Sequence, residues 1–229
     1  NNIRVSNVAD YGIDEVSDTA LAFLLWAARG IGRYNYLGLN LQDGSWESNI
    51  QTEIERISSN KLGIVGLGRI GGKLAMKAKA IGFNVLAFDP YQIAGYEKVI
   101  GVERVKSLQS LLNQSDYVSL NCDLNNSSRS LVDKNFLDAM KPRSSLINTA
   151  RGAIIDSIDV ILNYLESGHL RSFATDVLPE EPPSKKIQNR IKNSLKLQNQ
   201  VLITPHTAFY SKDSYIEMRY KAANNLLDL

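Results

Sequence analysis

Cysteine and histidine are scarce in this chain of 229 residues, and long apolar runs are absent. The only cysteine, Cys122, excludes a disulfide within the chain and is typical of a reducing, cytoplasmic setting. The longest apolar run, residues 20–28, is far shorter than the about 20 residues of a membrane-spanning helix. The 26 basic and 24 acidic residues nearly balance, so charge indicates neither a nucleic-acid partner nor a membrane surface. No metal site is predicted.

The first residues suggest a part of a longer protein. The chain starts at Asn1 rather than at methionine, and residues 3–7 (IRVSN) already resemble a β-strand. We interpret the sequence as a fragment, with processing or deliberate shortening as the alternatives.

Short apolar runs alternate with segments of helical spacing through most of the chain. This alternation is typical of β-α-β units, in which helices cover both faces of a buried parallel sheet. We therefore predict an α/β fold with a doubly wound, Rossmann-type parallel sheet. The predicted strands are residues 61–65, 84–88, 116–120, 144–148, 172–177 and 201–204, and the predicted helices are residues 69–81, 107–113, 133–140 and 156–167.

Three other segments have a different character. Residues 14–34 have the pattern of one long helix that is apolar almost all round, so we expect it to be buried, possibly against a partner chain. Residues 211–229 begin with a serine cap, Ser211, and continue as an amphipathic helix. Residues 179–200 contain three prolines and then five basic residues, which predicts a solvated loop, with a phosphate-binding patch as the alternative.

The stretch 63–90 (GIVGLGRIGGKLAMKAKAIGFNVLAFDP) contains a glycine motif between a predicted strand and a predicted helix. Gly66 permits a tight turn, Gly68 lets the backbone approach a pyrophosphate, and Gly71 allows the helix to pack closely on the strand. The free N–H groups at the start of the helix then favour the phosphate charge. The motif predicts a dinucleotide site, with a purely structural turn as the alternative.

An acidic residue after the second predicted strand indicates which dinucleotide is bound. Asp89 lies 23 residues beyond Gly66, where a carboxylate can accept both ribose hydroxyls and would repel a 2′-phosphate. Residues 90–95 contain no arginine that could bind such a phosphate. The sequence therefore favours NAD over NADP.

Polar residues that could perform chemistry follow three later strands. Arg151 can present its guanidinium to a carboxylate, although a surface arginine would have the same pattern. His206 is a candidate general acid or base, and Glu181 could orient it, although two glutamates before a proline often form an exposed turn. Asp176 ends a predicted strand, whereas His169 is better explained as a capping or surface residue. Together with a hydride carrier, this set suits reversible reduction of a 2-oxo acid.

These motifs resemble a known family. GLGRIG with FDPY, then NTARG, DVLPEEP and TPHTAFYS are similar, in order and spacing, to the D-isomer-specific 2-hydroxyacid dehydrogenases over nearly the whole chain. Within that family, GFNVLAFDPY, SDYVSLNCDLN and the stretch from PHTAFYS most resemble the transcriptional co-repressors called C-terminal-binding proteins. The resemblance implies that Arg151 binds and polarises the substrate, that His206 delivers the proton, and that Glu181 pairs with His206.

The resemblance also implies the residues of the NAD site. Asp176 would lie near the nicotinamide carboxamide, and Phe209 stands where the co-repressors have a tryptophan beside the active site. The sequence NCDLNNSS departs from the proline- and threonine-rich loop of most members, so cofactor contacts at residues 123–128 are not implied. The other implied cofactor-binding residues are Gly66, Gly68, Arg69, Ile70, Gly71, Asp89, Cys122, Thr149 and Ala150.

Family members begin with a flavodoxin-like substrate domain that this chain largely lacks. The resemblance therefore implies that residues 1–229 form the NAD-binding domain, with a hinge and dimerisation helix at about 14–34 and a last helix leading back toward the missing domain. We expect a cytoplasmic homodimeric dehydrogenase of a small 2-hydroxy or 2-oxo acid whose identity the sequence does not reveal, the fragment itself being inactive. The alternatives are an NAD(H)-sensing scaffold of the co-repressor kind, for which a nuclear location would also fit, and a module that only binds NAD.

Overall fold

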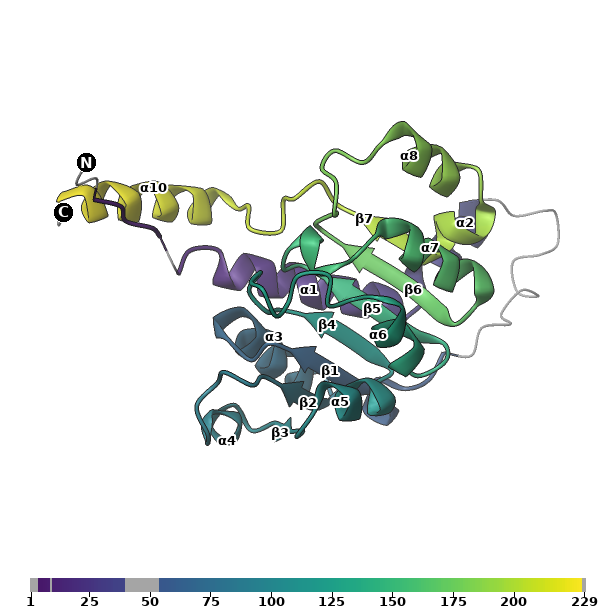
Figure 1. Cartoon of the computed structure of the whole chain (residues 1–229), viewed down its shortest axis with the longest axis horizontal. Helices are drawn as coiled ribbons and strands as arrows, with labels where there is room; N and C mark the ends of the chain where they lie inside the picture. The colour runs from purple at the N-terminus through teal and green to yellow at the C-terminus, as the bar shows by residue number, and fades with distance from the viewer. Residues whose placement is uncertain (1–3, 9, 40–53, 228–229) are drawn as a thin grey trace.

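Seven parallel strands form the centre of the molecule, and the predicted doubly wound sheet is confirmed. The structure is a computed structural model that describes residues 4–8, 10–39 and 54–227. The strand order is β3-β2-β1-β4-β5-β6-β7 (Figure 1). The first strand, β1, is an inner strand; β2 and β3 extend the sheet toward one edge, and β4 to β7 extend it toward the other. The strands are β1 (Lys61–Val65), β2 (Asn84–Phe88), β3 (Glu103–Arg104), β4 (Tyr117–Leu120), β5 (Ser144–Asn148), β6 (Leu170–Thr175) and β7 (Val201–Ile203).

Helices cover both faces of this sheet. One core lies between the sheet and α1 and α3, and the other lies between the sheet and α5, α6 and α7. Neighbouring strand residues point to opposite cores: Ile64 belongs to the first and Val65 to the second. The helices are α1 (Ile13–Ala28), α2 (Ile31–Leu39), α3 (Arg69–Ala80), α4 (Tyr96–Ile100), α5 (Leu108–Gln114), α6 (Lys134–Ala139), α7 (Ile158–Ser167), α8 (Lys185–Lys192), α9 (Leu195–Gln200) and α10 (Lys212–Leu227), with short 3-10 turns at Ile57–Ser59 and Gly152–Ile154.

The single helix predicted over residues 14–34 is two helices. Gly30 has a φ of +60°, and the chain turns there between α1 and α2. Only one side of α1 is buried, against α3 and the sheet, whereas Asp18 and Ala22 are exposed. Alanine and leucine also occupy the partly exposed side of α1, so burial of that side against a partner chain stays a prediction.

The loop predicted over residues 179–200 is wrong as well, because it contains α8 and α9. Ser184 and Ser194 cap these helices through their hydroxyl oxygens. Arg190 of α8 binds Asp159 and Glu166 of α7 at 2.6 and 2.7 Å, which attaches the segment to the body of the domain. The basic residues therefore do not form one free patch, since Arg190 is paired with carboxylates.

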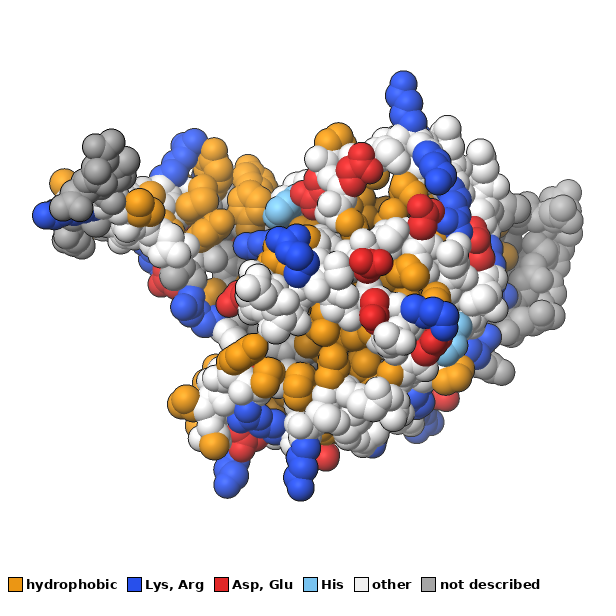
Figure 2. Space-filling model, in the orientation of Figure 1, with side chains coloured by type: hydrophobic (Ala, Val, Ile, Leu, Met, Phe, Trp, Pro, Cys, Tyr) orange, Lys and Arg blue, Asp and Glu red, His pale blue; other side chains and the backbone are white. Residues whose placement is uncertain are grey.

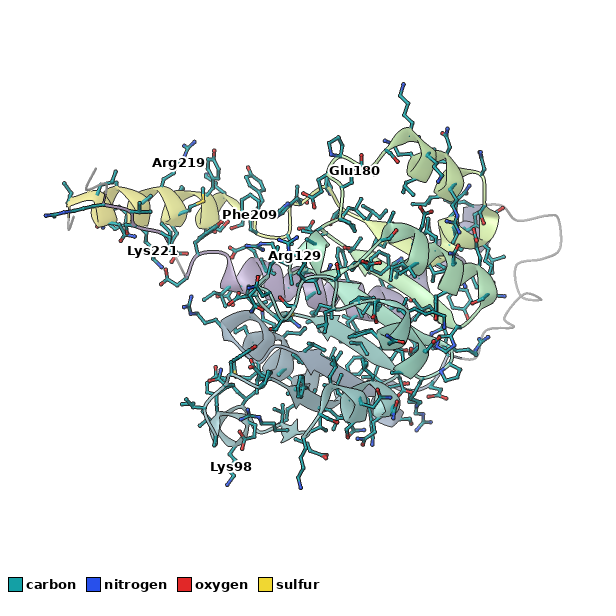
Figure 3. All side chains as sticks on the ribbon, viewed as in Figure 1. Lys98, Arg129, Glu180, Phe209, Arg219 and Lys221 are labelled. Carbon is teal, nitrogen blue, oxygen red and sulfur yellow. The ribbon has the colours of Figure 1, made fainter. Side chains whose placement is uncertain are left out.

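The first described residues and the last helix form an arm that extends away from the sheet (Figure 1). Residues 4–8 are not a strand, contrary to the prediction. They run beside α10, where Asn225 donates to the carbonyl of Asn7 at 2.9 Å and Lys221 binds Asp10 at 2.8 Å (Figure 3). The helix begins where Ser211 accepts from the N–H of Ser214, as predicted, but its apolar side chains are largely exposed: Ile216, Tyr220, Leu226 and Leu227.

Two glycines set the turn that follows β1. Gly66 has a φ of +94°, and a Cβ there would lie 2.6 Å from the backbone nitrogen of Cys122. A Cβ on Gly71 would lie 2.0 Å from the carbonyl oxygen of Gly66, so α3 approaches the turn as closely as backbone allows. The predicted structural roles of both glycines are confirmed.

Replacement of Gly71 by alanine should therefore destabilise the domain. The added methyl must push α3 away from the turn, and we expect a loss of about 1–3 kcal/mol in the free energy of unfolding, measured by urea denaturation. Gly38 of α2 is the matched control, because a Cβ added there would meet nothing within 4 Å. Gly38→Ala should leave the free energy of unfolding unchanged or raise it by at most about 1 kcal/mol, because alanine has the higher helix propensity. Equal stability of the two variants would contradict this account of the turn.

Candidate functional site

A cavity of about 970 Å³ lies at the carboxyl edge of the sheet, where the loops after six of the strands meet. It opens as a hollow between the arm of α10 and the segment around α4 (Figure 2). Twelve predicted residues line it. They are Gly66, Gly68, Arg69, Ile70, Asp89, Cys122, Thr149, Ala150, Arg151, Asp176, His206 and Phe209.

The floor of the cavity is the turn between β1 and α3. A Cβ on Gly68 would meet nothing within 4 Å, so this glycine leaves room for a ligand rather than for another part of the chain. The first N–H groups of α3 have no carbonyl partner within the helix and point out of its end. Two lining residues also carry buried oxygens without a partner, Asn121 Oδ1 and Thr149 Oγ1. The N–H groups at the start of α3, the open space at Gly68 and the two buried oxygens fit a dinucleotide with its pyrophosphate on the turn.

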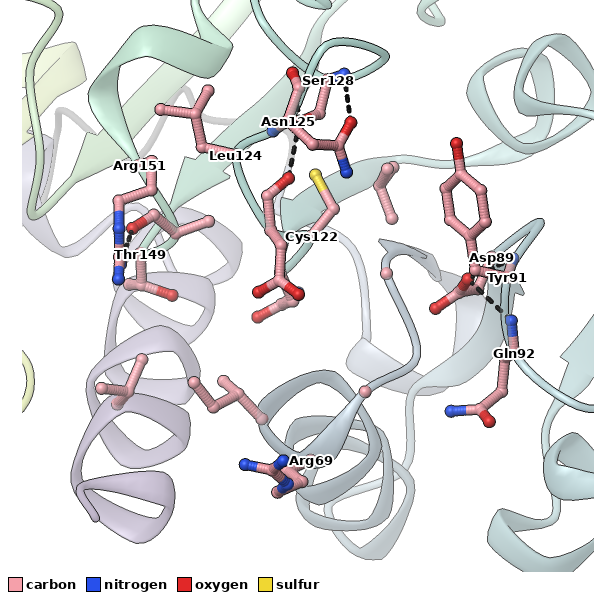
Figure 4. A pocket seen from close by; sticks show the side chains of 18 of the residues that line it. Arg69, Asp89, Tyr91, Gln92, Cys122, Leu124, Asn125, Ser128, Thr149 and Arg151 are labelled. Atoms are coloured by element: carbon pink, nitrogen blue, oxygen red, sulfur yellow. Dashed lines mark hydrogen bonds between the residues drawn. The ribbon is translucent and has the colours of Figure 1, made fainter. Parts of the chain in front are cut away.

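Asp89 follows β2 on the far side of the cavity from Thr149 and Arg151 (Figure 4). Its carboxylate accepts N–H groups of Leu67 at 2.8 Å, Tyr91 at 2.9 Å and Gln92 at 3.1 Å. A carboxylate has about four lone-pair positions, so one is left for a ribose hydroxyl rather than the two expected. Its negative charge still disfavours a 2′-phosphate.

Arg104 is a neighbour of Asp89 that sequence reasoning missed. It ends β3, fifteen residues away in sequence, and its guanidinium donates to the backbone carbonyls of Asp89 and of Gln92. The guanidinium of Arg104 therefore stabilises the backbone of the loop after β2. It also lies 3.8 Å from the carboxylate of Glu97. Its carbonyl partners leave no signal in the sequence.

Cys122 lies at the end of β4 and lines the same cavity (Figure 4). Burial raises the pKa of the Cys122 thiol to about 11, so the thiol stays protonated at neutral pH. On the same side, the hydroxyls of Tyr91 and Ser127 are 2.9 Å apart and join the loop after β2 to the loop after β4. Both residues line the cavity and were missed by the sequence analysis.

Arg151 is held in a short loop after β5. The side chain of Asn148 accepts from the N–H of Ala150 at 3.0 Å and donates to the carbonyl of Arg151 at 3.1 Å. The next residue must be glycine, because a Cβ on Gly152 would lie 1.8 Å from the carbonyl oxygen of Leu178. This contact brings the loop of Arg151 against the loop after β6. The guanidinium itself is exposed and donates to its neighbour's carbonyl.

His206 and Glu181 meet at the rim of the cavity, although they lie 25 residues apart. His206 Nδ1 is 2.9 Å from Glu181 Oε2, and the other oxygen of Glu181 accepts from the N–H of Leu178 at 2.8 Å. A carboxylate only accepts hydrogen bonds, so Nδ1 carries the proton and Nε2 remains on the outer side of the ring. The His206 backbone has a φ of +56°, a conformation that few residues other than glycine adopt.

Asp176 explains how His206 keeps that conformation. It lies just beyond β6, rather than inside the strand as predicted, and is only 3% exposed. Its carboxylate accepts from Thr204 Oγ1, from the N–H of Thr207 at 2.9 Å and from the N–H of Ala208 at 2.8 Å, and its carbonyl accepts from the N–H of His206 at 2.8 Å. The carboxylate thus organises the turn that carries His206.

Two predicted residues do not line the cavity. Gly71 packs α3 on the turn, and Glu181 reaches the cavity only through His206. The other predicted histidine, His169, lies away from it, where its ring contacts Tyr164 and bonds to the carbonyl of Leu137, in line with a structural role.

Among the described residues, no three histidine, cysteine or acidic side chains gather where they could hold a metal ion. None of the helices described is long and apolar enough to cross a membrane.

The sequence profile of one protein family matches residues 21–208, and its description is D-isomer specific 2-hydroxyacid dehydrogenase, NAD binding domain. The chain belongs to this family. The matched part includes the glycine turn, Arg151, Glu181 and His206, and the family is one of NAD-binding domains. The predicted cofactor is thereby confirmed.

Relatives of the domain include two similar in sequence and one similar in structure. It is 31% identical to D-3-phosphoglycerate dehydrogenase of Methanocaldococcus jannaschii over 204 residues, covering 89% of this chain and 37% of that protein. It is 31% identical to hydroxypyruvate reductase of Blautia hydrogenotrophica over 229 residues, covering 98% and 67%. The structure of D-lactate dehydrogenase from Aquifex aeolicus, complexed with NAD and lactic acid, superposes with a TM-score of 0.81 at 25% identity, covering 96% and 67%. The chain thus spans between 37% and 67% of the length of these relatives.

Whether NAD covers Cys122 in the cavity can be tested with iodoacetamide. With a pKa of about 11, roughly 0.1% of the thiol is ionised at pH 8, against roughly a quarter of an ordinary cysteine, so alkylation of the native chain should be slow. The rate should rise steadily with pH up to about 11, because the thiolate is the reactive form. Saturating NAD should slow it further, and mass spectrometry follows the product. Fast alkylation at pH 8 that NAD does not affect would contradict the placement.

Proposed function

We propose that the protein is an NAD-dependent dehydrogenase that interconverts a small 2-hydroxy acid and its 2-oxo acid. The observation that carries this proposal is the contact between His206 and Glu181 at 2.9 Å, on the rim of the cavity that Arg151 also lines. The names of the relatives support it, since lactate, 3-phosphoglycerate and hydroxypyruvate are all 2-hydroxy or 2-oxo acids. Which acid this protein uses is left to a substrate panel.

In this proposal Arg151 binds the substrate carboxylate and polarises its keto oxygen. The guanidinium offers five N–H donors in a planar fork and stays charged at any working pH. Two of its donors can bind the carboxylate, and the positive charge stabilises negative charge that develops on the keto oxygen. The bound cofactor supplies the hydride for reduction and accepts it for oxidation.

His206 moves the proton in the same proposal. When protonated, it donates from Nε2 to the keto oxygen, and in the reverse direction it accepts the hydroxyl proton there. Glu181 accepts from Nδ1 and so leaves Nε2 to face the substrate. Because Glu181 is itself fixed by the N–H of Leu178, it holds the ring in one orientation. Asp176 keeps the backbone of His206 in place from the other side.

No contact or cavity among the described residues favours the alternative of an NAD(H)-sensing co-repressor-like scaffold. The dehydrogenase reaction is therefore the function that we propose. Since the relatives are longer than this chain, we further propose that the domain of 229 residues binds NAD but turns over no substrate alone. His206 is half exposed, and an exposed site neither excludes water nor holds the acid.

Arg151→Gln should separate catalysis from cofactor binding in the full-length protein. The neutral amide cannot form the charged fork with a carboxylate, so kcat/KM for 2-oxo acids should fall by at least about 100-fold. Affinity for NADH should change by less than about twofold. The assay follows loss of NADH absorbance over a panel of 2-oxo acids, and NADH fluorescence reports its binding.

Arg129→Gln provides the matched control for Arg151→Gln. Arg129 is exposed on the loop after β4, carries the same charge and does not line the cavity (Figure 3). Its replacement should leave kcat/KM within about twofold. Turnover by Arg151→Gln equal to that of the control would refute the proposed anchor.

We also propose a homodimer through α1. Ala22 is exposed on this helix and Leu25 is partly exposed, which leaves apolar surface outside the packed side of α1. Ala22→Glu would place a charge on that surface without disturbing the buried side. Sedimentation velocity at micromolar concentration should show a dimer for the wild type and a monomer for the variant. A wild-type monomer under these conditions would overturn the proposal.

A further inference from the structure

Leu67, the middle residue of the glycine turn, is held by hydrogen bonds on both of its backbone groups. Its N–H donates to Asp89 Oδ2 at 2.8 Å, and its carbonyl accepts from Gln92 Nε2 at 2.8 Å. Its side chain is 1% exposed in the core that α1 and α3 share with the sheet. The turn between Gly66 and Gly68 is therefore fixed by two side chains from the loop after β2.

The bond from Gln92 also determines where the next N–H group points. In a planar trans peptide the C=O and N–H bonds point in opposite directions. The Leu67 carbonyl is drawn toward Gln92, so the N–H of Gly68 faces the other way. Gly68 lines the cavity, and space stays open where its Cβ would be. This N–H and the first ones of α3 are the groups that a pyrophosphate would contact.

Gln92 is itself held so that its amide nitrogen is directed at Leu67. Its backbone N–H donates to Asp89 Oδ1 at 3.1 Å, and its carbonyl accepts from Arg104 at 3.0 Å. Its side-chain oxygen accepts from the N–H of Ile93 at 3.1 Å, which leaves the NH₂ group for the Leu67 carbonyl. Figure 4 shows Gln92 beside Asp89 and across the cavity from Thr149. The amide therefore has one assigned orientation.

We propose that Gln92 is a positioning residue for NAD, one that sets the pyrophosphate-binding turn through the carbonyl of Leu67. It acts without contacting the chemistry, and it controls affinity for ligands that carry a pyrophosphate. The proposal rests on the NAD site alone and not on the dehydrogenase reaction proposed above. Its test therefore needs no substrate.

Two variants of Gln92 separate this bond from its surroundings. Gln92→Glu has the same shape and still accepts from Ile93, but it presents an oxygen to the Leu67 carbonyl instead of a donor. Gln92→Met removes the donor without adding charge. Calorimetry on the 229-residue chain gives the affinities for NAD and for ADP-ribose, and ligand-observed NMR gives that for adenosine.

We expect both variants to bind NAD and ADP-ribose about three- to tenfold more weakly, the size of one net hydrogen bond. Adenosine, which lacks the pyrophosphate, should change by less than about twofold. Gln188→Glu is the matched control, because Gln188 makes the same amide-to-carbonyl bond, to Pro183 at 2.8 Å, away from the cavity. Its affinities should equal those of the wild type, whatever its thermal stability.

Three results would overturn the proposal. Unchanged NAD affinity in Gln92→Met would show that the bond does not set the turn. An equal loss for adenosine would show that Gln92 only supports the loop after β2, and a loss confined to Gln92→Glu would assign the effect to charge. Failure of the wild type to bind NAD would instead contradict the cofactor site itself, whereas failure of the dehydrogenase assay alone leaves this test intact.

Discussion

The parallel direction of all seven strands is the constraint on which the site depends. Every strand delivers the residues that follow it to the same edge of the sheet, so loops that are distant in sequence meet there. β1 pairs with β2 on one side and with β4 on the other, and the chain leaves β1 and β4 in opposite directions. The cavity opens between those two exits. The glycine turn, Cys122, Arg151 and His206 are neighbours for this reason and not because their local sequences attract one another.

The loops at this edge are irregular, and their backbone groups need partners that no ladder supplies. Short polar side chains provide them. Asp89 accepts three N–H groups, Asp176 accepts two N–H groups and a hydroxyl, and Asn148 accepts and donates once each. Residues that look from the sequence like ligand-binding groups thus bind the protein's own backbone first. The carboxylate of Asp89 joins the glycine turn to the loop after β2, and that of Asp176 holds the loop after β7. Only part of their hydrogen-bonding capacity remains for a ligand.

Structural features were predicted from the sequence where the residues that determine them lie close together in the chain. β1, β2 and β5 were predicted to the residue, because each is a short segment with adjacent apolar residues that follows a helical segment or a turn. The glycine turn was predicted because a φ of +94° at Gly66 and the close approach at Gly71 exclude other residues. α8 and α9 were missed because their polar, basic composition lacks an apolar face long enough to show a period. Arg104 and Gln92 were missed because both act on carbonyl groups, which every residue has. The contact of Glu181 with His206 followed from the resemblance, not from any spacing.

In the proposed reaction, the residues on the cofactor side are more buried in this domain than those on the substrate side. The proposed cofactor side is partly buried: Gly66 and Asp176 are buried, and Cys122 lies in surroundings that raise its thiol pKa, although Arg69 is exposed. The substrate side is open, since Arg151 is exposed and half of the His206 side chain reaches solvent. Charged groups in water bind and discriminate weakly, because solvent screens them and competes for their hydrogen bonds. In the proposed reaction, Arg151 and His206 alone would therefore discriminate weakly among 2-oxo acids, whereas the carboxylate of Asp89 lines the cavity and would repel the 2′-phosphate of NADP.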